Sequence, residues 1–219
     1  MRKKTRTIRI GRTAIGGEEP VRIQSMTNTD TADIEATAAQ IAALEAAGCE
    51  IVRVAAYDKH SAGCIAKLKE KVNIPIVADV HFDYRIAIAA IEAGADKVRI
   101  NPGNYVDPAR TFKHLEYTDE EYAAELSRLE ERFKQLLAIC REHGTALRIG
   151  VNHGSLSDRI MSRYGDTPEG IVESCMEFLR VCVKENFPDV VISIKASNTV
   201  VMVRSVRLLC SVMAKEGMD

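Results

Sequence analysis

The sequence predicts an α/β fold of the TIM-type (β/α) barrel kind, because short β-branched runs alternate with longer helical patterns along the chain. The same runs carry polar residues at alternate positions, which is typical of strands around a partly polar interior. Six strand–helix units can be counted, whereas a closed barrel needs eight units and about 250 residues. We therefore expect a single, incomplete barrel domain over residues 1–219, truncated after about six units.

The elements are expected in the following order. Residues 5–10 and 13–15 are typical of a short N-terminal hairpin, which can close the bottom of a barrel. The β-branched runs predict strands at 21–26, 51–55, 76–80, 97–101, 146–152 and 190–195, and the helical patterns predict helices at 33–47, 61–72, 84–93, 118–143, 168–186 and 199–216. The helix at 118–143 opens with a capping box, Thr118 to Glu121. We interpret it as an outer crossover helix in preference to a partner-binding helix.

Composition and charge narrow the function classes. The net charge is −1 at pH 7, which argues against a general binder of nucleic acid or of membrane surfaces. The basic N-terminus lacks the apolar core of a secretory signal, and no apolar run approaches the length of a membrane span, so we expect a cytoplasmic location. The six cysteines show no C-x-x-C spacing, and we interpret them as reduced thiols that mostly pack in the core, with no metal site.

Cations gather on the polar face of the predicted strands. Arg53, Arg99, Arg148 and Lys195 lie in the later halves of four strands, and Lys97 shares the face of Arg99. Asp79 is the acid of matching parity. Two like charges about 6 Å apart repel by roughly 3 kcal/mol at an effective dielectric constant of 20. We therefore infer a phosphate or diphosphate ligand at the carboxyl ends of the strands. The alternative is that each cation pairs with a neighbouring acid.

Polar residues in the loops after the strands add candidates. Asn101 and Asn152 begin small turns, and Asn198 either contacts the ligand or caps the next helix. Asp79 and His81 form an acid–base pair or, alternatively, a salt-bridge anchor for Arg53 or Arg99. The proton donor stays open, and the candidates are Asp79, His81 and His153.

Five motifs together resemble a known family. The strings QSMTNT (24–29), VADVHFDY (77–84), VRINPGN (98–104), LRIGVNHGSL (147–156) and SIKASN (193–198) are similar to the N-terminal barrel of the 4-hydroxy-3-methylbut-2-enyl diphosphate synthases. The resemblance implies reductive opening of 2-C-methylerythritol 2,4-cyclodiphosphate in the non-mevalonate route to isoprenoids. It assigns substrate binding to the side chains at Arg53, Arg99, Asn101, Arg148, Asn152 and Lys195.

The resemblance also implies groups that this chain lacks. In the family, three cysteines and a glutamate of a separate C-terminal domain hold a 4Fe-4S cluster, an external donor supplies electrons, and the full-length protein is a homodimer. We expect that domain and the last two barrel units to be missing from this sequence, and the six cysteines do not match the cluster ligands by position. We therefore expect no cofactor in this chain, and no turnover by the chain alone.

Two other functions are weighed. Lys195 could form a Schiff base with a sugar phosphate in an aldolase-type barrel, because a lysine in a cationic pocket has a lowered pKa and is more nucleophilic. The chain could also be a non-catalytic fragment that assembles with another component. The dihydropteroate synthase barrel is similar in topology, but the phosphate-binding residues fit it less well.

Overall fold

The structure is a computed structural model that describes residues 5–81, 83–106 and 116–218. The chain divides into two compact units. The first unit comprises Met1–Ile100 and Ala138–Arg148, and the second comprises Asn101–Leu137 and Ile149–Asp219. The expectation of one domain over residues 1–219 stays a prediction.

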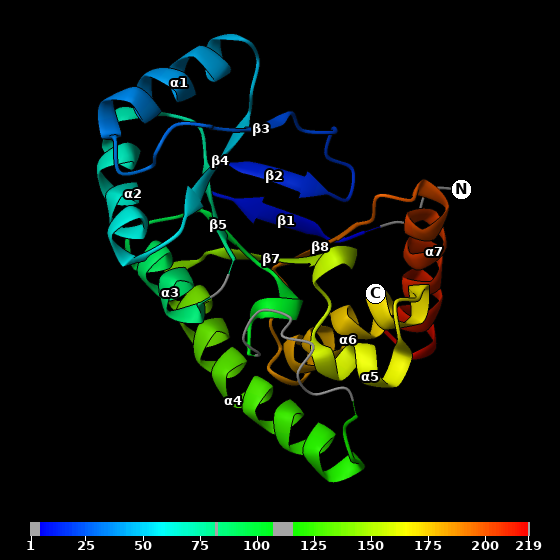
Figure 1. Ribbon diagram of the computed structural model, residues 1–219. Coiled ribbons are helices and arrows are strands. Elements are labelled where there is room, and N and C mark those ends of the chain that lie inside the picture. Colours follow the sequence, from blue (N-terminus) through cyan, green and yellow to red (C-terminus); the bar gives the residue numbers. More distant parts are fainter. Residues whose placement is uncertain (1–4, 82, 107–115, 219) are drawn as a thin grey trace. The chain divides into compact units, whose positions relative to one another are not determined.

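The first unit contains the hairpin and the first strand–helix repeats. Its elements are β1 (Thr7–Ile10), β2 (Thr13–Gly16), β3 (Gln24–Met26), α1 (Ile34–Ala46), β4 (Ile51–Ala56), α2 (Lys59–Lys71), β5 (Ile76–Val80), α3 (Tyr84–Glu92) and β6 (Lys97–Ile100). Strands β3, β4, β5 and β6 are parallel neighbours. Figure 1 shows α2 and α3 along the outer side of β4 and β5.

The strand register places the polar face in layers. Arg53 lies opposite Met26 and Val77, and Asp79 lies opposite Arg99. Lys97 on β6 is also opposite Val77, in the layer of Arg53 and one layer below Arg99. The alternate side chains, among them Val52, Val54, Ala78 and Val98, are fully buried. The expected division into an apolar face and a polar face is therefore confirmed.

The predicted hairpin is confirmed, and its turn packs at the amino ends of β5 and β6. Gly11 has a φ of +55°, and a Cβ added there would lie 2.5 Å from the Asp96 carboxylate. That carboxylate is fixed, because Asp96 Oδ2 accepts hydrogen bonds from Lys69 Nζ at 2.6 Å and from the Ile76 backbone N–H at 2.8 Å. The turn therefore requires a glycine both for its φ and for the close approach.

The second unit contains longer helices. Its elements are η1 (Pro102–Asn104), α4 (Asp119–His143), β7 (Ala146–Asn152), η2 (His153–Ser155), α5 (Asp158–Tyr164), α6 (Pro168–Lys184), β8 (Val190–Lys195) and α7 (Thr199–Lys215). The last residues of α4 and the first residues of β7 belong to the first unit. The strand order of the sheet is β3-β4-β5-β6-β7-β8. Every expected strand and helix is present, and α5 is an additional short helix.

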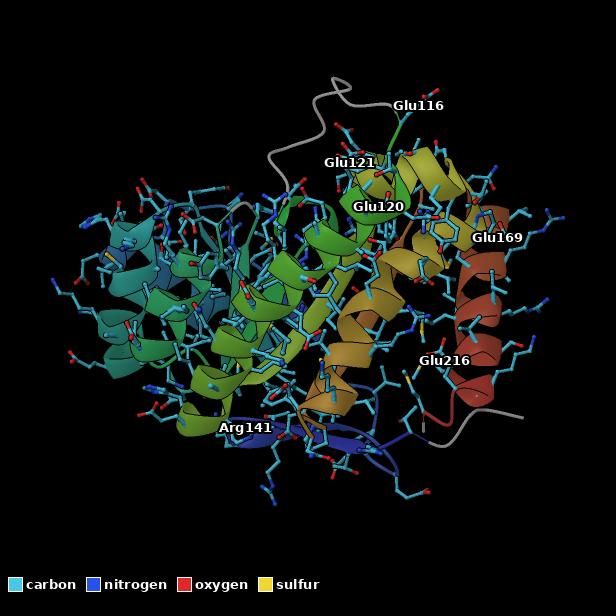
Figure 2. The ribbon with its side chains drawn as sticks, turned by 90° about the horizontal axis from the view of Figure 1, so that it is seen from below. Glu116, Glu120, Glu121, Arg141, Glu169 and Glu216 are labelled. Carbon is cyan, nitrogen blue, oxygen red and sulfur yellow. The ribbon has the colours of Figure 1, made fainter. Side chains whose placement is uncertain are left out.

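The charged residues at the two ends of α4 are placed favourably for its helix dipole. Its first turn carries Asp119, Glu120 and Glu121, and its last turn carries Arg141 and His143. Figure 2 shows Glu120 and Glu121 at one end of the helix and Arg141 at the other. Acids near the amino end and bases near the carboxyl end each stabilise a helix by a few tenths of a kcal/mol up to about 1 kcal/mol.

Aromatic rings and one buried ion pair form the core of the second unit. The rings of Phe133 and Phe178 meet edge to face with centroids 4.9 Å apart, and Tyr105 packs against both. Arg159 is 3% exposed and makes a two-pronged ion pair with Glu177, with Nη2 2.8 Å from Oε2.

In the described ranges of the chain, no helix is long and apolar enough to cross a membrane.

We expect Gly11→Ala to lower the free energy of unfolding by about 2 kcal/mol, because alanine disfavours the left-handed φ and its methyl group meets Asp96. Urea denaturation followed by circular dichroism measures this. Gly63→Ala is the matched control, because an added Cβ in α2 meets nothing within 4 Å. Equal stabilities of the wild type and the Gly11→Ala variant would contradict the close approach.

We expect Glu177→Ala to lower the free energy of unfolding by about 3–5 kcal/mol, because it removes the carboxylate that neutralises the buried Arg159 guanidinium. The double variant Arg159→Met, Glu177→Met removes both charges and is expected to lose less. Thermal denaturation of the three proteins makes the comparison. A double variant less stable than Glu177→Ala would show that the ion pair is itself a large net contribution.

Candidate functional site

One buried carboxylate joins two arginines of the first unit. Asp79 on β5 is 3% exposed, and its Oδ1 lies 3.1 Å from Arg99 Nη1 on β6. Its Oδ2 lies 3.5 Å from Arg53 Nε on β4. Arg53 Nε also lies 3.2 Å from the Met26 sulfur on β3. The sequence left two roles open for Asp79, and the geometry confirms that it anchors both arginines.

Arg148 on β7 is the third guanidinium at this site. It is half-buried, and its pKa is lowered by burial and then by the charges of Arg53 and Arg99, while the charge of Asp79 acts in the opposite direction. We call Arg53, Arg99 and Arg148 the arginine cluster. Three guanidiniums face one carboxylate, so these four groups carry a net charge of about +2.

The ion pairs at Asp79 bear on the two interpretations of the strand cations. Arg53 and Arg99 meet at the same carboxylate. Burial makes the mutual repulsion of the cluster costly, because charges are less screened away from water. An anion with two negative charges would offset the excess, and guanidinium forks match phosphate oxygens.

His81 and Tyr57 lie beside the anchor. His81 Nε2 is 3.7 Å from Asp79 Oδ2, and the His81 side chain is 31% exposed. The ring of Tyr57 stacks on His81 with centroids 6.4 Å apart, and Tyr57 is 66% exposed. His81 therefore combines contact with the anchor and access to solvent, which a proton-transfer group needs.

Sequence reasoning missed one residue of this site. Lys97 is 3% exposed, and its Nζ donates a hydrogen bond to Gln24 Oε1 at 3.4 Å. Burial, followed by the charges of Arg148 and Arg53, lowers the pKa of Lys97 to about 8. The alternation along the strand gave a signal, because it placed Lys97 on the face of Arg99. The sequence had linked a lowered lysine pKa to Lys195 instead.

Two loops of the second unit are joined through Asn101 and Gly103. Asn101 Nδ2 donates a hydrogen bond to Ser155 Oγ at 2.9 Å, and Asn101 Oδ1 accepts one from the Gly103 N–H at 3.3 Å. A Cβ added to Gly103 would lie 1.5 Å from the Ser155 carbonyl oxygen. Asn152 Oδ1 closes the second loop by accepting from the Gly154 N–H at 3.3 Å. Asn101 and Asn152 thus shape the loops that follow β6 and β7.

The other predicted site residues of the second unit each have a different environment. Asn198 caps α7, since its side-chain oxygen accepts hydrogen bonds from the N–H groups of Val200 and Val201. The capping interpretation of Asn198 is therefore confirmed. Lys195 ends β8 and is exposed. His153 faces the Asp166 carboxylate.

The cysteines do not provide an iron–sulfur site. All six are free, and only Cys210 is exposed. Burial raises the pKa of the Cys140 and Cys175 thiols to about 12, which disfavours the thiolate form that a cluster needs. Across the described ranges, no three or more His, Cys, Asp or Glu side chains gather closely enough to hold a metal ion. These residues therefore do not fit a cluster.

Comparisons with known proteins give close relatives. A 4-hydroxy-3-methylbut-2-en-1-yl diphosphate synthase (flavodoxin) from Parabacteroides distasonis is 60% identical over 99% of this chain, which spans 36% of that protein. The chloroplastic ferredoxin-type synthase of Arabidopsis thaliana is 45% identical over the whole chain, which spans 30% of that protein. The chain thus covers about a third of the length of these relatives. A dihydropteroate synthase structure from Xanthomonas albilineans aligns at 14% identity with a TM-score of 0.37, too low to support a conclusion.

The family comparison also settles the fold class. A family model described as the GcpE TIM-barrel domain matches residues 5–216, which confirms the predicted barrel-type fold. Because this match takes in both the strands that carry the arginine cluster and the two joined loops, the chain belongs to the GcpE TIM-barrel domain family.

Proposed function

We propose that this chain is the substrate-binding barrel portion of a 4-hydroxy-3-methylbut-2-en-1-yl diphosphate synthase, and that it binds 2-C-methylerythritol 2,4-cyclodiphosphate. The observation that carries the proposal is the arginine cluster, in which Arg53 and Arg99 share the Asp79 carboxylate and Arg148 adds a third charge. The relatives that bear this name at 58–60% identity support it.

The ligand chemistry matches the charge of the cluster. Each phosphorus of a cyclic diphosphate ester keeps one ionised oxygen, so the ligand is a dianion at neutral pH. Its two charges offset the excess of about +2 left by Asp79 among the arginines. Guanidinium groups bind such oxygens with two parallel hydrogen bonds, which fixes the orientation of the ring as well as its position.

The second unit carries further candidate ligand residues. Asn101, Asn152, Lys195 and Asn198 remain proposed ligand residues on the strength of the family motifs. We assign Asp79 to positioning, because it holds two arginines. His81 and His153 then remain the candidates for proton transfer.

The reaction proposed for the whole protein is the reductive opening of the cyclic diphosphate. The names of the relatives specify flavodoxin or ferredoxin, which supports an external electron donor. We further propose that the 4Fe-4S cluster lies outside this chain, that the full-length protein is a cytoplasmic homodimer, and that this chain alone does not turn over substrate. The role of the described residues is to bind and orient the diphosphate.

We expect Arg148→Ala to weaken binding of the cyclodiphosphate by about 10- to 100-fold, because a hydrogen-bonded charge contributes about 1.5–3 kcal/mol. Isothermal titration calorimetry at fixed salt measures the dissociation constant. Arg141→Ala is the matched control, since Arg141 is exposed in the last turn of α4. Equal affinities of the wild type and Arg148→Ala would overturn the proposed site.

We expect no covalent adduct when the chain is treated with borohydride and a sugar phosphate, because the aldolase alternative rests on a nucleophilic lysine that no observed contact supports at Lys195. Intact-mass spectrometry detects an adduct, and Lys195→Met is the control. An adduct that forms on the wild type and disappears in Lys195→Met would replace the present proposal with the aldolase.

A further inference from the structure

A buried lysine lies in the same layer as Arg53 and one layer below Arg99. Lys97 and Arg99 are two residues apart on β6, so their side chains leave the same face of the strand. Lys97 is opposite Val77, and Asp79 is opposite Arg99, which places Lys97 on the amino-terminal side of the anchor. The residue is 3% exposed. Burying a charged amine costs several kcal/mol unless a partner stabilises it.

Among the residues that the structure describes, the side chain that contacts Lys97 is a neutral amide. The contact from β3 is the Gln24 side-chain oxygen, 3.4 Å from Nζ. The charges that act on it from β4 and β7 are those of Arg53 and Arg148, both of the same sign. On β5, Asp79 makes its ion pairs with Arg53 and Arg99, and His81 lies beside it. The amine is thus surrounded by a neutral amide and by cations that are themselves partly paired.

Binding at the cluster must therefore act on Lys97. Arg53 and Arg148 disfavour the protonated amine electrostatically, and a dianion on these arginines cancels their field. Coupling between two binding events is reciprocal, so a ligand that favours protonation of Lys97 is itself bound more tightly when Lys97 is protonated. We propose that Lys97 takes up a proton when the arginine cluster binds a dianion, and so couples the affinity for the dianion to pH.

The sign of the effect follows from the protonation states. Lys97 has a pKa of about 8 in the free protein, so it is mostly protonated at pH 7 and mostly neutral at pH 9. The bound anion raises this pKa toward the ordinary value of about 10.4. The complex then holds more protons than the free protein between these two values. Affinity is therefore constant below pH 7 and falls as the pH rises through 8.

The ligand does not obscure the measurement. Each phosphate of the cyclodiphosphate is both esterified and joined to the other phosphate. Its one remaining acidic oxygen therefore stays ionised between pH 6.5 and 9.5. The guanidiniums stay protonated throughout this range. His81 is the second titratable side chain at the anchor, and a His81→Gln variant separates its contribution from that of Lys97.

Calorimetric titration of the chain with the cyclodiphosphate from pH 6.5 to 9.5 tests the inference, which rests on the proposed function. We expect the dissociation constant to rise between pH 7 and 9, by up to about tenfold, because the anion offsets the charges of Arg148 and Arg53 while the lysine stays buried. Repeating the titration at pH 8.5 in buffers of different ionisation enthalpy should show net proton uptake, of at most about one proton per ligand.

Variants of Lys97 distinguish coupling from a merely structural role. Lys97→Met should bind more weakly at pH 7, with a flat pH profile and no proton uptake. Lys97→Arg should also give a flat profile, because its charge does not titrate in this range. Lys67→Gln is the matched control, because Lys67 is an exposed lysine of α2, and it should keep the wild-type profile. The fall in affinity between pH 7 and 9 should persist in His81→Gln, whatever the affinity of that variant at pH 7.

The outcomes separate the two proposals. Wild-type binding with a flat profile and no proton uptake would overturn the role of Lys97 and leave the proposed function intact. A pH dependence that persists in Lys97→Met, or disappears in His81→Gln, would also overturn it. Absence of any binding at pH 7 would overturn both the proposed function and this inference.

Discussion

The carboxylate of Asp79 holds together the cations on which the first unit's site depends. It is almost fully buried, and it meets arginines from the two strands that flank its own. Without it, three guanidiniums would repel each other in a poorly solvated setting. With it, two of the three guanidiniums meet at one carboxylate. The same carboxylate thus holds in place the cations to which we assign anion binding.

Alternation of side chains along a strand explains how much of this site the sequence could predict. Arg53, Arg99 and Arg148 share one face because their positions share one parity, and this follows from the chain without coordinates. Which acid would pair with which arginine could not be predicted, since that depends on strand register. The register places Asp79 opposite Arg99, and this pairing decided that the two arginines share one acid.

Sequence reasoning missed three features of the structure, each for its own physical reason. Helix α5 has seven residues, too few to show a clear helical period, although Ser157 caps it through a bond to the Ile160 N–H. The alternation along the strand predicts that Lys97 shares the face of Arg99. It does not predict that Lys97 is buried, because lysines are mostly exposed. The sequence also did not predict the structural role of Asn101, whose side chain links two loops that are more than fifty residues apart in sequence. Such contacts exist only once the chain is folded.

The close approach of Gly103 to Ser155 bears on how these loops move. The backbone of one loop rests directly against the carbonyl of the other, and a side-chain amide fastens the same pair. Neither loop can move far without moving the other. The turns that follow β6 and β7 are consequently coupled, and a displacement of one is shared by both.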